Sequence, residues 1–208
     1  MADVTEFMIN GKRYYLSSVM DLFSRRILAW KIGMRNTTQL IKTTFLKAYD
    51  FRKPDGTVLF HSDRGANYTS KVYFKCLFDH SIIRSVSRPK TPYDNSVKES
   101  FFKTFKCEEI YRRIYRSEKE MLESIEKFIT YYNNERPHSY LGYKAPAEAE
   151  RLYYEKTQND LDMPSPKVAA FSVLFSVFGC FDFSCLNAFL HTFVENGCFC
   201  LKQGTFDT

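Results

Sequence analysis

The 208-residue sequence predicts an α/β fold in which a mixed five-stranded sheet is flanked by helices. Three short segments near the N-terminus alternate apolar and polar residues and are separated by turn residues, as antiparallel strands are. Two later apolar segments each follow a stretch with helical spacing, which is typical of strand–helix–strand crossovers. The rest of the first 155 residues has helical periodicity. A hydrophobic content of 44% is enough for a sizeable core.

Turn residues and periodicity set the expected boundaries. Asn10-Gly11 is a strong hairpin signal between the first two strands. Leu40, Ile41, Phe45 and Ala48 recur at intervals of three and four, as on one face of a helix. The expected elements of this half are strands at 4–9, 14–22, 27–32, 57–61 and 82–86 and helices at 37–51 and 70–79.

The second half is predicted to be helical. Helices are expected at 95–111 and 117–133, with a short final helix near 145–154. This order of elements fits an RNase H-like fold. From about Met163 charged residues become sparse, and Pro164-Ser165-Pro166 marks a break. We therefore expect a core domain at 1–155 and, at 156–208, an irregular or helical appendage of unknown role.

The charge balance favours an acidic partner. The formal net charge is +6 and the pI about 8.9, and the positive excess lies within residues 1–162. A basic protein of this kind suits nucleic acid.

The longest apolar run, 168–181, is shorter than the roughly 20 residues of a membrane span, so no membrane helix is expected. The six cysteines form no C-x-x-C pair, which argues against zinc. No signal peptide is recognised, so we expect a reducing, intracellular setting.

Three acidic residues are candidates for a site. Asp63 follows an apolar strand, at the end where open α/β sheets place ligands, although Asp63-Arg64-Gly65 also reads as an ordinary turn. Glu99 lies on a predicted helix, and Asp3 lies beside the first strand, where it could be an ordinary strand residue. Three carboxylates gathered by a fold would bind divalent cations and support phosphodiester chemistry.

The helix that carries Glu99 is predicted to have one stripe that includes charges of both signs. Helical spacing of four, three and four residues predicts that Asn95, Glu99, Phe102 and Lys106 share one side of the helix. A lysine placed there can hold a phosphate as a point charge. The alternative for these side chains is a solvated helix face with ordinary acid–base pairs.

Five separated phrases occur in a specific order, and 35 residues lie between Asp63 and Glu99. The phrases are DVTEF at 3–7, YLS with DLFSR across 15–25, HSDRG at 61–65, YDNSVKESFF at 93–102 and YNNERPH at 132–138, and LGYKAPAE at 141–148 follows. Together they closely resemble the catalytic core of bacterial insertion-sequence transposases of the retroviral-integrase-like group, over about residues 2–150. Both the 35-residue spacing and the basic residue seven positions after Glu99, Lys106, match that family's D-D-E pattern.

The resemblance implies an RNase H-like core in which Asp3, Asp63 and Glu99 are catalytic and bind two Mg²⁺ or Mn²⁺ ions. The implied reaction is hydrolysis and strand transfer at DNA 3′ ends, with water or a 3′-hydroxyl as nucleophile. Asn95 and Lys106 would contact DNA near the cut. The residues whose charge and loop position make them candidates for contacts with the DNA backbone are Arg64, Arg88 and Lys90.

The implied partners are double-stranded DNA, as element ends and as target, and further copies of the chain. A bacterial, cytoplasmic, nucleoid-associated protein is expected. Family members usually carry a helix-turn-helix region before the core, and the sequence starts two residues before Asp3, so a truncated remnant is expected. Two alternatives remain: a catalytically incompetent module that only binds DNA or forms oligomers, and a related nuclease on the same fold.

Overall fold

The computed structural model describes residues 1–86 and 95–162. Met1–Gln158 form one compact unit and Asn159–Thr208 a second, and the fold and sites below lie in the first. The strands are β1 (Ala2–Ile9), β2 (Lys12–Met20), β3 (Ile27–Gly33), β4 (Val58–Ser62) and β5 (Ile82–Val86). The helices are α1 (Thr38–Arg52), α2 (Lys71–Phe78), α3 (Ser96–Phe105), α4 (Glu118–Asn134) and α5 (Pro146–Asp162), with a π-helix, η2, at Lys106–Ile110 and a 3₁₀ turn, η3, at Ser139–Leu141.

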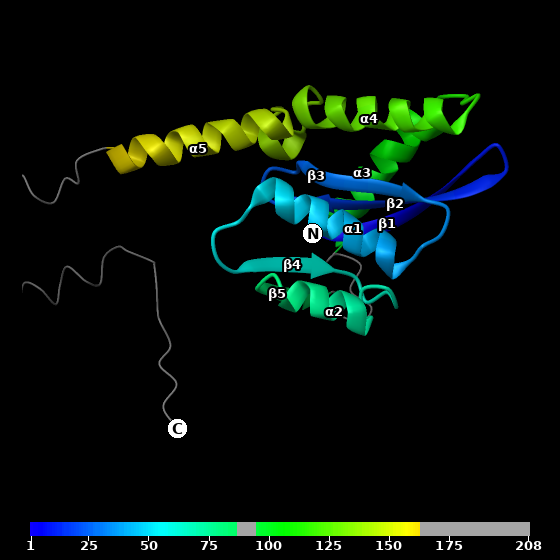
Figure 1. Ribbon diagram of the computed structural model, residues 1–208. Helices are drawn as coiled ribbons and strands as arrows, with labels where there is room; N and C mark the ends of the chain where they lie inside the picture. Colours follow the sequence, from blue (N-terminus) through cyan, green and yellow to red (C-terminus); the bar gives the residue numbers. More distant parts are fainter. Residues whose placement is uncertain (87–94, 163–208) are drawn as a thin grey trace, which may run out of the picture. The chain divides into compact units, whose positions relative to one another are not determined.

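The five predicted strands are present, and their ladders form two groups. β1, β2 and β3 make an antiparallel sheet in that order, while β4 and β5 pair in parallel. At the first hairpin Asn10 and Gly11 have φ of 51° and 73°, as the predicted two-residue turn requires. β1 packs beside β4 (Figure 1). The prediction of one continuous sheet is corrected in this respect, because apolar patterns identify strands but do not specify how closely two backbones approach.

Helices cover both faces of the antiparallel sheet (Figure 1). On one face α3, η2 and α4 pack against Phe7, Tyr14 and Leu16 in a core rich in aromatic rings. On the other face α1 and α2 pack with Val19, Phe60 and neighbouring apolar residues. Successive strand residues point to opposite faces, so β1, β2 and β3 each contribute to both cores. A polar residue at a core position of these strands is brought under a helix.

Two helices differ from their predicted form. The helix expected at 95–111 is α3 followed by the π-turn η2, and the helix expected near 145–154 extends to Asp162. Periodicity does not distinguish α from π hydrogen bonding over one turn.

In the described part of the chain, no helix is long and apolar enough to cross a membrane. Most of the predicted appendage at 156–208 lies outside the described residues.

Candidate active site

Asp3 lies on the face of the sheet that α3 covers. It shares this face of β1 with Thr5 and Phe7, because strand residues two apart point the same way. In the β1–β2 ladder its partner is Ser18. The backbone N–H of Val4 donates a 2.7 Å hydrogen bond to Asp3 Oδ1. Strand pairing thus places a carboxylate and a hydroxyl side by side under a helix.

Lys98 of α3 joins this pair and was not singled out by the sequence. It is fully buried, and its Nζ donates a 2.6 Å hydrogen bond to Ser18 Oγ. The ammonium also lies over the rings of Phe101 and Phe102, 5.3 and 5.2 Å from their centroids. Burial lowers the pKa of Lys98, and the charge of Asp3 partly offsets that effect. A sequence signal existed, because Lys98 lies three and four residues before two buried phenylalanines.

Asp63 is the first residue after β4, as predicted. Its Oδ1 accepts a 2.9 Å hydrogen bond from the backbone N–H of Gly65. A Cβ atom at position 65 would lie 3.1 Å from Oδ1 and 3.3 Å from Oδ2. Glycine therefore lets the carboxylate lie directly against the turn, which fixes where it points.

The three acids come from three elements and lie within electrostatic reach of one another. Burial is the main reason that the pKa of Asp3 is raised, the Val4 N–H and Lys98 lower it, and the charges of Asp63 and Glu99 raise it further. Glu99 itself is exposed on α3. Across residues 1–86 and 95–162, no group of three or more acidic, histidine or cysteine side chains is already arranged closely enough to hold a metal ion.

Tyr68 is a second neighbour of the acids that the sequence did not indicate. Its side chain is 2% exposed, and its hydroxyl has no hydrogen-bond partner within the described part of the chain. Burial raises its pKa, with smaller contributions from Tyr73 and from the charges of Asp3 and Asp63. The phenol is therefore neutral and lies close to two of the three carboxylates.

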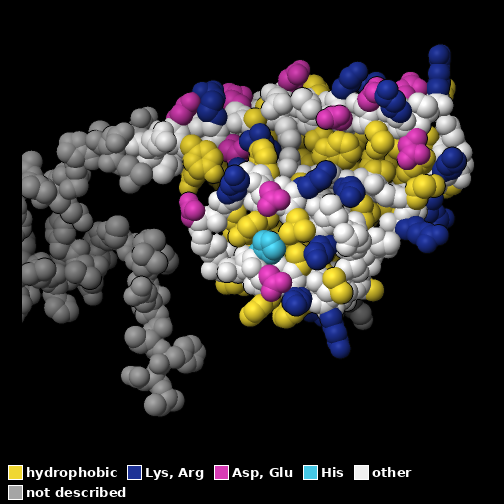
Figure 2. All heavy atoms as spheres, viewed as in Figure 1, with side chains coloured by type: hydrophobic (Ala, Val, Ile, Leu, Met, Phe, Trp, Pro, Cys, Tyr) yellow, Lys and Arg dark blue, Asp and Glu magenta, His cyan; other side chains and the backbone are white. Residues whose placement is uncertain are grey.

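The predicted stripe of α3 runs along the boundary of the core. Phe102 is buried and Glu99 is exposed, with Asn95 at the residue preceding α3 and Lys106, half-buried, at the first position of η2. Arg64 is exposed beside Asp63. Arg88 and Lys90 lie outside the described residues. On the face drawn in Figure 2, basic and acidic side chains are interspersed.

The fold is shared with retroviral integrases. The chain matches the simian T-cell lymphotropic virus intasome, in complex with the PP2A regulatory subunit B56 gamma, with a TM-score of 0.57 and 16% identity, over 71% of this chain and 52% of that one. It matches the HTLV-2 integrase catalytic core domain in complex with magnesium with a TM-score of 0.55 and 15% identity, over 71% of this chain and 92% of that one. The predicted RNase H-like fold is thus confirmed.

Sequence comparisons identify the family. Two models of the integrase core domain match residues 1–92 and 80–146. The transposase for insertion sequence element IS904 of Lactococcus lactis is 36% identical over 152 residues, which are 73% of this chain and 60% of that protein. Transposase InsF for insertion sequence IS3A of Escherichia coli is 34% identical over 149 residues, 71% of this chain and 52% of that protein. The chain spans about half the length of such relatives. It belongs to the insertion-sequence transposases with an integrase core domain.

Proposed function

We propose that this chain catalyses DNA transposition: hydrolysis of a phosphodiester at a DNA 3′ end and transfer of that end to a target strand, with Asp3, Asp63 and Glu99 as the catalytic carboxylates. The observation that supports this most is electrostatic. The charges of Asp63 and Glu99 reach Asp3, although the three residues lie on β1, after β4 and on α3. Gathering like charges from three elements costs free energy. An arrangement with such a cost is typical of a functional site.

The donor set suits a hard divalent cation. Carboxylate oxygens are the ligands that Mg²⁺ and Mn²⁺ accept, and a cation among these three acids would relieve their mutual repulsion. The related HTLV-2 core is described in complex with magnesium. We propose that Asp3, Asp63 and Glu99 hold two Mg²⁺ or Mn²⁺ ions. Bound there, the ions would supply an activated nucleophile and stabilise the leaving oxygen of an in-line displacement.

The chain's own residues orient this reaction. Lys98, held by Ser18, balances the charge of Asp3 from within the core, and the Gly65 N–H fixes Asp63. In the first step water attacks phosphorus, the bond to the 3′ oxygen breaks, and a 3′-hydroxyl is released. In the second step this hydroxyl attacks a target phosphodiester and displaces another 3′ oxygen. Neither step requires a protein nucleophile.

The proposed substrate is double-stranded DNA, both the element ends and the target. Asn95 and Lys106, with Arg64, Arg88 and Lys90, would contact DNA close to the reacting phosphate, because basic groups around a carboxylate site attract the phosphate backbone. Assembly of several copies on DNA is supported by the intasome and the trimeric integrase core among the structural relatives. The setting would be the bacterial cytoplasm, at the nucleoid.

A cleavage assay tests this proposal. Purified chain is incubated with end-labelled duplex DNA and Mn²⁺, beside Asp63→Asn and a control, Asp55→Asn, at an exposed turn residue. Wild type and the control should cut or join strands, and Asp63→Asn should lose the activity by at least about a hundredfold. If wild type binds DNA but shows no metal-dependent activity, the result would instead indicate a module that only binds DNA.

A further inference from the structure

A cavity of about 590 Å³ lies between α3 and the turn that follows α4. That volume is within the range of roughly 300–1,000 Å³ usual for pockets that take small organic groups. One wall is a ridge of α3 formed by Ser96, Ser100 and Thr104, which recur every fourth residue. Glu99 is not among the lining residues, but Ser100 is the next residue of α3, so the cavity and the proposed catalytic acid lie on neighbouring sides of one helix.

The opposite wall presents aromatic rings to solvent. Tyr140 is 70% exposed and Tyr143 is 77% exposed. The guanidinium of Arg25, from the β2–β3 turn, stacks 4.0 Å from the centre of the Tyr140 ring. Arg25 and Tyr143 both have φ of 62°, a conformation that non-glycine residues rarely adopt. Two strained turns, far apart in sequence, therefore bring a cation and two rings to the same cavity.

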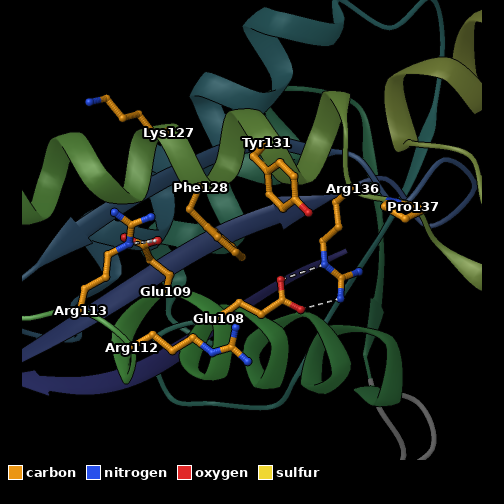
Figure 3. Close-up of a pocket in the computed structure, with 9 residues that line it drawn as sticks. All are labelled: Glu108, Glu109, Arg112, Arg113, Lys127, Phe128, Tyr131, Arg136 and Pro137. Atoms are coloured by element: carbon orange, nitrogen blue, oxygen red, sulfur yellow. Dashed lines mark hydrogen bonds and ion pairs between the residues drawn. The ribbon is translucent and has the colours of Figure 1, made fainter.

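The charge of the cavity favours an anionic ligand. Two of its lining residues, Arg25 and Arg136, are basic and none of those described is acidic. Arg136 is committed to Glu108 through hydrogen bonds of 3.0 and 2.8 Å, as Figure 3 shows. The adjoining cavity in that view also has Arg113 paired with Glu109 at 3.0 Å. The cavity at Arg25 differs from this adjoining cavity. Among the described residues, Arg25 takes part in no ion pair.

His138 also lines the cavity, as a neutral and partly buried ring. Its ring bonds to the backbone carbonyl of Tyr132, and its Nε2 has no partner within the described part of the chain. Burial and the charge of Arg136 lower the pKa of His138, so the ring is neutral near pH 7. With Nδ1 donating to the carbonyl, Nε2 is the acceptor. Because Nε2 is buried, the groups of the lining that can meet a polar edge are the hydroxyls of Ser100 and Thr104.

We propose that this cavity holds one unpaired nucleotide of the bound DNA, displaced from the duplex beside the reacting phosphodiester. The base stacks on Tyr140 and Tyr143, its edge meets the hydroxyls of α3, and Arg25 binds its phosphate. Aromatic rings that face solvent beside a basic group are the usual platform for single-stranded bases. This inference rests on the proposed function, since DNA must be the ligand.

Binding of the full chain to labelled DNA tests it. Two duplexes are compared, one blunt and one with a two-nucleotide single-stranded end that carries 2-aminopurine. Wild type should bind the single-stranded end more tightly and quench its fluorescence. Tyr140→Ala should weaken that complex about tenfold and abolish quenching, because a stacking platform is lost, while blunt-duplex binding stays unchanged. Tyr140→Phe should behave like wild type, as should Tyr111→Ala, a control at a tyrosine that is 69% exposed elsewhere.

The outcomes separate this inference from the proposed function. Equal binding of the single-stranded end by wild type and Tyr140→Ala, with blunt duplex still bound, would overturn the nucleotide site alone. No binding of either DNA would overturn both proposals. A changed oligomeric state in Tyr140→Ala, measured by sedimentation, would show that this face joins copies of the chain and would also overturn the nucleotide site. Melting temperatures that match wild type establish that each variant is folded.

Discussion

Lys98 shows how one buried charge can organise a site. It lies in the core, where it donates a hydrogen bond to Ser18 and interacts with the charge of Asp3 and with the N-terminal ammonium of Met1. Removing one partner of a buried pair leaves the other desolvated and uncompensated. We predict that Lys98→Met lowers the free energy of unfolding by about 3–5 kcal/mol, measured by urea denaturation. Lys103→Met, at an exposed position of the same helix, should change it little.

A double-mutant cycle isolates the Lys98–Asp3 interaction. If the two side chains stabilise each other, the combined variant Asp3→Asn with Lys98→Met should lose less than the sum of the single losses. Strict additivity would contradict the pairing.

Gly65 controls the position of Asp63 rather than the fold. A methyl group there would meet both carboxylate oxygens at 3.1 and 3.3 Å. We predict that Gly65→Ala slows DNA cleavage about tenfold to a hundredfold, since a displacement of about 1 Å in a catalytic group has effects of that size. Its melting temperature should stay near that of wild type. Ala66→Ser is the neighbouring control, and an unchanged cleavage rate in Gly65→Ala would show that the turn does not set the carboxylate.

The contrast between these residues explains what the sequence could reveal about the site. Asp63 and Glu99 lie within phrases whose spacing is fixed, so both could be proposed from the sequence alone. Lys98 and Tyr68 lie within the same phrases or close to them, but a lysine on a helix is usually solvated and a tyrosine usually packs. Only the register of Asp3 with Ser18, and the side of α3 that packs on β2, indicate what Lys98 does.

The attachment of α5 depends on one buried carboxylate. Glu150, 6% exposed, accepts a 2.5 Å hydrogen bond from Arg26 and also contacts Arg52, which in turn lies 2.7 Å from Asp21. We predict that Glu150→Gln lowers the free energy of unfolding by about 2 kcal/mol, because partly buried Arg26 loses its counter-charge and Arg52 keeps only Asp21. Urea denaturation measures this loss.

Glu155→Gln is the matched control on the same helix. Its partner Arg151 and Glu155 itself are 61% and 50% exposed, and such surface pairs contribute well under about 1 kcal/mol. A loss in Glu150→Gln no larger than in Glu155→Gln would contradict the anchoring role.

Elements that depend on local signals are predicted from the sequence better than elements that depend on tertiary contacts. The Asn10-Gly11 turn and the apolar spacing of α1 are local signals, and both elements form where they were expected. The π-turn at Lys106–Ile110 is stabilised by a tertiary contact instead: the buried Glu109 accepts hydrogen bonds from Tyr115 and from Ser124 of α4. No pattern within one helix encodes such a contact, so the sequence predicted an uninterrupted helix there.

The whole core places its chemistry where its layers meet. The antiparallel sheet packs helices on both faces, and β1 contacts both β4 and α3. Element order and apolar periodicity were sufficient to predict this class of fold. They could not show that the ladders fall into two sheets, because strand-to-strand distance depends on side chains from both cores. The convergence of the acids that we propose therefore depends on the complete fold and on no single segment.

Binding of Mn²⁺ to the full chain, measured by calorimetric titration with each acid substituted in turn, tests this convergence most directly. Asp3→Asn, Asp63→Asn and Glu99→Gln should each weaken binding by at least about tenfold, because each removes a charged ligand from one shared site. Glu123→Gln, at an exposed residue of α4, should leave it unchanged. Binding of wild-type affinity in all three variants would contradict a site built from Asp3, Asp63 and Glu99.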